Sequence, residues 1–196
     1  MLLAHRFLPA VVLAVMSAST FASTITYTSS AAFMAHVAPG FYTETFDGLS
    51  DPSTGNFSGG AFAYTASAPN DIYVGGGFLG ASQEDDALTI TFTSGNVRAL
   101  GADFFATDIS DNGISTLVTI TLSDGTVESF TPTTFADSFR GFSADLAITS
   151  LVISGPGTSL YAGLDNLTVG TVPEPTSWAL VGLALAGMLA ARRRSA

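Results

Sequence analysis

Residues 116–130 read TLVTITLSDGTVESF, and this stretch carries the strongest structural signal in the chain. Apolar and β-branched residues alternate with polar ones on both sides of Asp124-Gly125, which is typical of two strands joined by a tight turn. Because Asp-Gly favours a two-residue hairpin turn, we expect Leu122 to lie opposite Val127. The stretch therefore predicts an antiparallel β-hairpin.

The same register places Phe130 opposite Thr119 on the polar face, so it also predicts a β-bulge between Val127 and Phe130. Similar short segments, separated by Gly, Pro, Asn and Asp, recur along most of the chain. They predict strands at residues 24–28, 42–46, 61–66, 71–74, 88–93, 97–107, 115–122, 126–131, 148–153 and 160–169. Many short strands of this kind indicate an all-β fold, a β-sandwich of jelly-roll-like form.

One short helix is predicted near the amino-terminal end of this region, in SSAAFMAHVAPG (residues 29–40). Ser29 or Ser30 would cap it, and Phe33 and Val37 would share one face. The Pro-Gly pair that follows would end it.

Two segments are predicted to be long surface loops, SDPSTGNFSGG (residues 50–60) and VGGGFLGASQEDDA (residues 74–87). The second contains the pattern G-x-G-x-x-G at Gly75, Gly77 and Gly80. No apolar helix follows it, so we do not interpret it as a dinucleotide-binding motif.

The charge of the chain is strongly negative. The 196 residues include sixteen acidic residues, six arginines, no lysine and no cysteine. Between residues 23 and 172, fifteen carboxylates face only Arg98 and Arg140, which leaves a net charge of −13. Such a body repels phosphate backbones, so the sequence argues against nucleic-acid binding. The absence of cysteine excludes disulfides, thiolate zinc sites and a cysteine nucleophile.

The amino-terminal segment MLLAHRFLPAVVLAVMSASTFA (residues 1–22) has the layout of a secretory signal peptide. His5 and Arg6 precede an apolar stretch, and small residues follow it. Cleavage after Ala22 is predicted, with cleavage after Ser19 as the alternative. The remaining chain is long enough for one domain, which we place at residues 23–171.

The carboxyl-terminal segment, residues 172–196, does not follow the strand pattern. Pro173, Glu174 and Pro175 hold the backbone extended, and residues 176–191 are uncharged and just long enough for a transmembrane helix. The positive charges that would keep the far end in the cytoplasm come last, at Arg192, Arg193 and Arg194. One interpretation of this segment is a simple membrane anchor.

This combination resembles the PEP-CTERM sorting signal of exported bacterial proteins. The resemblance implies processing at residues 173–175 by an exosortase, a membrane protease or transpeptidase. The protein would be anchored transiently in the inner membrane and then delivered to the cell surface or extracellular matrix. Such systems accompany exopolysaccharide production, which links the chain to biofilm formation.

The body also resembles β-sandwich domains found in PEP-CTERM proteins. The similar pieces are YTETFDGL, ALGADFFATD, TLSDGT, FRGFSADLAITSLVISG and LDNLTVG. This resemblance implies a fold rather than a function.

Two sets of residues are candidates for structural calcium, the one cofactor we consider. In jelly rolls the first long strand commonly pairs with the last, which would bring Glu44 and Asp47 near Asp165. Similar carbohydrate-binding jelly rolls hold a structural calcium ion between those two strands. The alternative is that these are exposed carboxylates at strand ends.

The second set is DISDNG, where Asp108, Ser110 and Asn112 match the opening of a calcium loop. Position twelve is Thr119 instead of glutamate, so the bidentate ligand is missing, and a turn between strands explains the same residues.

A structural or adhesive role in the exopolysaccharide matrix is the function we predict, with divalent cations bridging the acidic body to any acidic polymer. A carbohydrate-binding module is the alternative, for which Tyr42, Tyr64, Tyr73 and Tyr161 could supply stacking rings. A glycoside hydrolase is less favoured. The chain has no G-x-S-x-G motif, and carboxylate spacing selects no catalytic pair, so we predict that the protein is not an enzyme.

Overall fold

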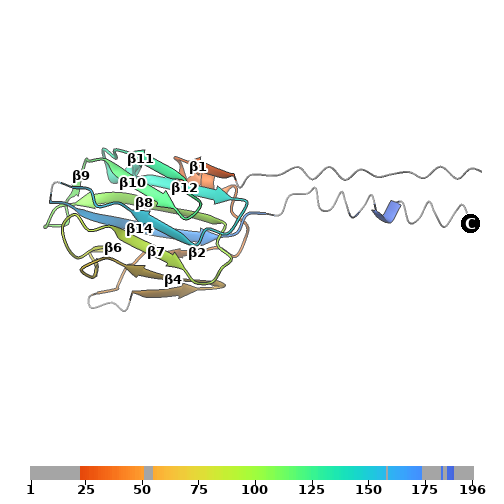
Figure 1. Cartoon of the computed structure of the whole chain (residues 1–196), viewed down its shortest axis with the longest axis horizontal. Helices are drawn as coiled ribbons and strands as arrows, with labels where there is room; N and C mark the ends of the chain where they lie inside the picture. Colours follow the sequence, from red (N-terminus) through yellow and green to blue (C-terminus); the bar gives the residue numbers. More distant parts are fainter. Residues whose placement is uncertain (1–22, 51–54, 158, 174–181, 183–184, 188–196) are drawn as a thin grey trace, which may run out of the picture.

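The computed structural model describes residues 23–50, 55–157, 159–173, 182 and 185–187 (Figure 1). Within them the chain forms fourteen β-strands, the helix α1 (Ser30–Met34) and the single 3-10 turn η1 (Phe135–Asp137). The strands make two sheets, which confirms the all-β sandwich predicted from the sequence.

The larger sheet has eight antiparallel strands. Six run in the order β1 (Thr24–Tyr27), β12 (Phe139–Ala144), β8 (Ala99–Thr107), β14 (Tyr161–Gly170), β6 (Phe78–Ala81), β5 (Ile72–Gly75). The other two are β2 (Tyr42–Glu44), which pairs with β14, and β9 (Gly113–Ile114), which pairs with β8. The smaller sheet has the order β11 (Val127–Phe130), β10 (Val118–Leu122), β13 (Ser150–Ile153), β7 (Leu88–Phe92), β4 (Phe62–Ser67), β3 (Asn56–Gly59).

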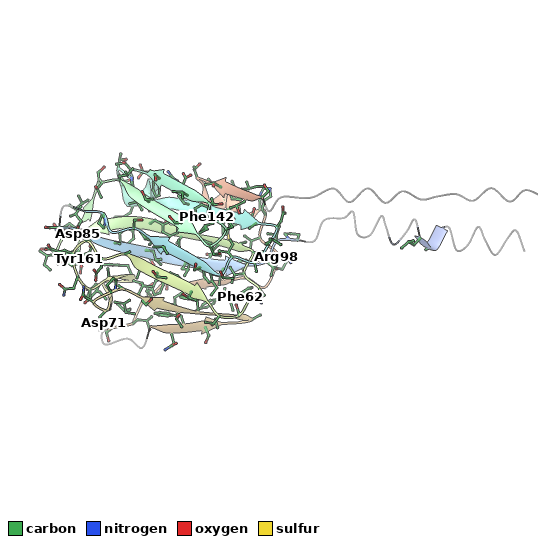
Figure 2. All side chains as sticks on the ribbon, in the orientation of Figure 1. Phe62, Asp71, Asp85, Arg98, Phe142 and Tyr161 are labelled. Carbon is green, nitrogen blue, oxygen red and sulfur yellow. The ribbon has the colours of Figure 1, made fainter. Side chains whose placement is uncertain are left out.

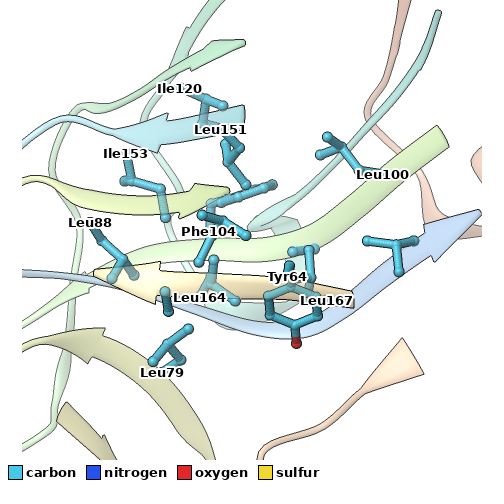
Figure 3. Packing of buried hydrophobic residues seen from close by; sticks show 14 of the residues in the cluster. Tyr64, Leu79, Leu88, Leu100, Phe104, Ile120, Leu151, Ile153, Leu164 and Leu167 are labelled. Atoms are coloured by element: carbon cyan, nitrogen blue, oxygen red, sulfur yellow. The ribbon is translucent and has the colours of Figure 1, made fainter. Parts of the chain in front are cut away.

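The main core lies between the sheets. Successive side chains of a strand point to opposite faces, so alternate residues of each strand enter it. In β8 these are Leu100, Ala102 and Phe104, all fully buried. Figure 3 shows Phe104 close to Leu164 of β14, with Tyr64 of β4 nearby. Each large side chain buried in this way contributes roughly 1.5–3 kcal/mol relative to an exposed one.

A second, smaller cluster lies on the outer face of the larger sheet, where α1 covers it. Phe33 and Val37 are buried there together with Ala99 of β8. Ser29 is the residue that caps the helix, since its side chain accepts a hydrogen bond from the Ala32 backbone N–H. The predicted helix is therefore confirmed, but its α-helical part is only five residues long.

The central hairpin is confirmed, although the predicted register is wrong by one residue. Val127 pairs with Thr121 instead of Leu122, and Phe130 pairs with Val118. The loop has three residues, the last of which is Gly125 with φ of 89°. A three-residue loop with glycine in the left-handed region already supplies the shift, so both Phe130 and Val118 point into the core and no bulge is needed within the strands.

All ten predicted strand segments overlap observed strands, but four strands escaped the sequence analysis. The two predicted loops each contain one, β3 and β6. Gly76 and Gly77 have φ of 62° and 82°, so they form the two-residue turn of a hairpin between β5 and β6. The missed strand β12 is rich in small residues, and β9 has only two residues.

The terminal predictions fall mostly outside the described residues. The signal peptide at 1–22 lies outside them, as do Glu174, Pro175, Arg192, Arg193 and Arg194, and of the 176–191 segment only 182 and 185–187 are described. In the described part of the chain, no helix has the length and hydrophobicity to span a bilayer. The signal peptide, the transmembrane helix and the domain bounds stay predictions.

Candidate functional site

A hollow of about 360 Å³ lies over the half of the larger sheet's outer face that α1 leaves uncovered. It adjoins a second hollow of about 150 Å³, with which it shares Phe78, Thr107 and Asp111. Tyr161 lines the second hollow, and Figure 2 shows this residue at the opposite end of the sandwich from Arg98. The larger volume lies within the range of about 300–1,000 Å³ that is usual for small-molecule sites.

The strand β8 supplies the centre of the hollow. Its even-numbered residues up to Phe104 point into the core. Asp103, Phe105 and Thr107 alternate with them and face outward, where they line the hollow. The segment ALGADFFAT is therefore buried on both faces, with core on one side and the hollow on the other.

A row of four residues crosses the sheet beside the hollow. Phe105 pairs with Gly163, Gly163 pairs with Gly80, and Gly80 pairs with Tyr73. A Cβ atom on Gly163 would lie 2.9 Å from the Phe105 ring, and one on Gly80 would lie 3.3 Å from the Phe78 ring. Glycine at these two positions lets the aromatic rings lie directly on the sheet backbone.

Four aromatic rings form a continuous series along the hollow. The ring centroids are separated by 5.5 Å from Tyr73 to Phe78, 5.4 Å from Phe78 to Phe105 and 5.0 Å from Phe105 to Phe135. The last two contacts are edge-to-face, a favoured geometry for aromatic pairs. Phe135 is 55% exposed, so the series ends in a ring that solvent reaches.

The turn η1 holds Phe135 in this position. Thr134 caps the turn, and the Asp137 carboxylate accepts hydrogen bonds from Thr133 Oγ1 at 2.7 Å and from the Thr134 backbone N–H at 2.8 Å. These bonds hold the pKa of Asp137 well below its usual range, with the Thr133 side chain as the largest cause. These hydrogen bonds fix the turn and, with it, the position of the Phe135 ring.

Two carboxylates from adjacent strands meet at the hollow. Asp103 of β8 pairs in register with Asp165 of β14, and the side-chain amide of Asn166 donates to both, at 2.9 Å and 3.1 Å. The pairing of β8 with β14 is interrupted between Asp165 and Thr168, and Asn166 has φ of 53°. This bulge turns the amide toward the two carboxylates.

The environment of Asp165 is electrostatically unfavourable for its charge. Burial raises the pKa of Asp165 above its ordinary value, and the negative charges of Asp103 and Asp47 raise it further, while a hydrogen bond from the Asn166 backbone N–H opposes them. The hollow therefore contains closely spaced carboxylates.

The predicted calcium loop at residues 108–113 is a turn beside this hollow. The Asp108 carboxylate accepts the backbone N–H of Ser110 at 2.8 Å and of Asn112 at 3.0 Å, and also the Asn112 side-chain amide. The Asn112 amide, followed by the backbone bonds, lowers the pKa of Asp108. Asp111 accepts a hydrogen bond from the Tyr73 hydroxyl at 3.1 Å.

The structure brings only part of the other predicted calcium set together. The strands do pair as expected, with Glu44 opposite Leu167 in β14, and Asp47 lies near enough to Asp165 to influence its pKa. The Glu44 carboxylate accepts hydrogen bonds from the Tyr42 hydroxyl and the Phe46 backbone N–H. Among the described residues, no three His, Asp or Glu side chains are grouped so as to hold a metal ion. Calcium stays a prediction.

The four candidate tyrosines have different environments. Tyr73 and Tyr161 line the second hollow. Tyr64 is 1% exposed in the core, where burial strongly raises its pKa. Burial and the neighbouring Glu44 raise the pKa of Tyr42 to about 12.

Sequence reasoning missed Asp103, Asn166 and Phe135. The alternation of ALGADFFAT could have indicated that Asp103 and Phe105 share a face. No local pattern indicates that Asn166 bridges two strands, because the bridge depends on residues 63 positions apart.

Comparisons with known proteins concern mainly the tail. No curated protein matches the chain. One similar solved structure is the crystal structure of a Podospora anserina GH26-CBM35 β-(1,4)-mannanase, at 19% identity and a TM-score of 0.35. That match covers 70% of this chain and 29% of the mannanase chain, and a likeness of this degree assigns neither ligand nor activity.

The PEP-CTERM protein-sorting motif matches residues 171–194. The match begins directly after β14, and it contains Pro173, Glu174, Pro175 and the three arginines. The motif implies a membrane-anchored sorting signal that an exosortase processes. The resemblance predicted from the tail is thereby confirmed, and the chain is an exported protein that carries the PEP-CTERM sorting motif.

Proposed function

We propose that this protein is a non-enzymatic adhesive component of the cell surface or extracellular matrix, and that it binds polysaccharide through the aromatic hollow. The single observation that carries this proposal is the series from Tyr73 to Phe135, in which the buried rings of Phe78 and Phe105 support the exposed ring of Phe135 next to hydrogen-bonding carboxylate and amide groups. Sugars offer both an apolar face of C–H groups and a rim of hydroxyl groups. A site of this composition is suited to them.

The position of the hollow in the sandwich supports an outward-facing role. The sorting motif begins next to Gly170, whose carbonyl accepts a hydrogen bond from the Arg98 backbone N–H. Thr24, at the start of β1, pairs with Ala144, which also bonds to Arg98. Both ends of the domain are therefore at one end of the sandwich. A tail held at the membrane would leave Tyr161 and the hollow at the far end.

A recognition site suits the carboxylates better than a hydrolytic one. Hydrolases place two carboxyl groups across a scissile bond, about 5–9.5 Å apart. Asp103 and Asp165 lie on adjacent strands of one sheet and share one amide, so they line the same wall of the hollow and do not face one another across it. The non-enzymatic role is therefore part of our proposal.

A binding test uses the full chain in a zwitterionic detergent, with immobilised cellulose, chitin, chitosan and alginate. We expect saturable binding to at least one polymer, with affinity reduced about tenfold or more in Phe135→Ala because a stacking ring is removed. The control is Phe41→Ala, which removes a ring of similar exposure, 44%, just before β2. Binding to none of the polymers, or equal losses in the two variants, would reject the proposal.

The proposed destination has its own test. In cells of the producing bacterium, deletion of the exosortase should leave the protein in the inner-membrane fraction at a higher mass than the processed form. If the protein reaches the surface unchanged in mass and amount without the exosortase, processing by the exosortase is not needed for its delivery and that part of the proposal is rejected. Adding a chelator to the binding assay also tests cation bridging, because bridged binding would be lost.

A further inference from the structure

The charged side chains that line the two hollows are all acidic. Asp103, Asp111 and Asp165 line the larger hollow, and Asp108 lines the second one. No lysine or arginine lines either of them in the described part of the chain. A ligand that enters the hollow therefore meets several carboxylates without a compensating cation from the protein.

The basic residues of the described sandwich are occupied or distant. Arg140 pairs with Glu128 at 3.2 Å and lies 3.6 Å above the Phe130 ring. Arg98 lies at the other end of β8. When a ligand displaces water from the hollow, the carboxylates have no cationic partner from the protein. A positively charged group on the ligand would supply that partner.

We propose that the hollow selects a polysaccharide of amino sugars with free, positively charged amino groups. This inference rests on the proposed polysaccharide binding and adds the class of sugar. The sugar's C–H face would lie on Phe135, and its ammonium group would be directed at Asp111 and at the Asp103–Asp165 pair. An ammonium group is also attracted to the faces of the aromatic rings.

The carboxylates retain capacity for such a ligand. A carboxylate can accept about four hydrogen bonds. Asp111 accepts one, from Tyr73, among the described residues. Burial is the main cause of the raised pKa of Asp165, and the negative charges of Asp103 and Asp47 raise it further; a bound cation would relieve that repulsion. An acidic polymer would add a further negative charge to the hollow, and a neutral one would leave the repulsion in place.

Three matched tetrasaccharides test the inference by calorimetry with the full chain. These are β-1,4-linked glucosamine, N-acetylglucosamine and glucose tetramers, which share one backbone and differ at a single substituent. We expect the glucosamine tetramer to bind about tenfold tighter than the other two, as for one charge-assisted contact. The difference should shrink at high salt because screening weakens an exposed ion pair.

Two variants locate the contact. Asp111→Asn and Asp165→Asn keep the shape of the side chain and remove its charge, so each should bring the affinity for the glucosamine tetramer close to that for the neutral ones. Asp111 is exposed, so its variant keeps the test valid if Asp165→Asn fails to fold. Asp145→Asn is the control, because Asp145 is an exposed carboxylate that contacts the backbone of Ser23 outside the hollow.

Each outcome decides between the proposals. Tighter binding of a neutral tetramer, or equal losses in Asp111→Asn and Asp145→Asn, would overturn the amino-sugar inference and leave polysaccharide binding standing. Binding of none of the tetramers and none of the immobilised polymers would reject the proposed function itself.

Discussion

At each end of the larger sheet's outer face a phenylalanine ring lies on glycine, but the ring is buried at one end and exposed at the other. At the covered end, Phe33 of α1 lies on Gly101 and Gly141, where an added Cβ would approach its ring to 2.9 Å and 2.7 Å. At the open end, Phe135 of η1 lies on Gly113, where an added Cβ would approach to 2.7 Å. Phe33 is fully buried, whereas Phe135 is 55% exposed.

The difference comes from what carries each ring. The helix α1 and the turn after it supply both Phe33 and Val37, and together they seal the sheet with a small apolar cluster. The turn η1 has three residues and supplies one ring, next to carboxylates that cannot join an apolar cluster without a large desolvation cost. One sheet face is thus buried under an apolar cluster at one end and lined by an open, acidic hollow at the other.

The largest effect should follow from breaking the covered end with Phe33→Ala. Complete loss of this ring leaves a cavity against Tyr27 and Phe139, and we expect the free energy of unfolding to fall by about 3–5 kcal/mol. Urea denaturation of the full chain measures it. A loss no greater than that of Phe135→Ala would mean that the two ends are packed alike.

The next effect sharpens the contrast between the glycines. Gly141→Ala should cost about 1–3 kcal/mol, since the new methyl group meets Phe33 at its Cβ and Cγ atoms, which cannot turn away. Gly163→Ala meets only the edge of the Phe105 ring, which borders the hollow and can shift into it. We therefore expect Gly163→Ala to cost less in the same denaturation assay, and a larger cost would show that the open end is rigid.

A smaller effect is expected for Phe135→Ala. The ring is about half buried, so its removal should lower the free energy of unfolding by about 1 kcal/mol. Phe41→Ala at the covered end is the matched control and should cost a similar amount. A loss above 3 kcal/mol would make Phe135 a core residue, and its exposure to ligands would no longer follow.

The smallest effect concerns the clamp on η1. The folded-state pKa of Asp137 is depressed, so its stabilising contribution is present above the unfolded pKa of about 3.9 and is lost as pH falls through the lower folded value. The melting temperature of Asp137→Asn should therefore lie slightly below that of the unchanged protein at neutral pH, with the difference shrinking below pH 4. A difference that grows on acidification would contradict the clamp.

Much of the fold followed from local pattern. The alternation of VTITL and LTITF predicted strands β10 and β7, and Asp124-Gly125 predicted the turn between β10 and β11. The strand β6 was missed because three consecutive glycines precede it, and the same composition is typical of loops. The hairpin register was predicted wrongly. It is fixed by the turn type, and the turn type depends on which side chains the core accepts.

The candidate site was far less predictable. Tyr73 and Tyr161 were named from the sequence as stacking candidates and do line a hollow, whereas Tyr64 was named on the same grounds and is buried. Residue type alone does not distinguish these cases, because the face on which a strand residue lies depends on the register of its neighbours.

The sequence by itself determined that the protein is an acidic, cysteine-free sandwich with a sorting tail, since strand periodicity and the tail motif are both contiguous in the chain. Only the tertiary structure decided where the hollow lies. The hollow exists because β5, β6, β14 and β8 align Tyr73, two glycines and Phe105 in one row, and because η1 returns to that row with Phe135. Such alignment depends on contacts between distant segments, which no local pattern encodes.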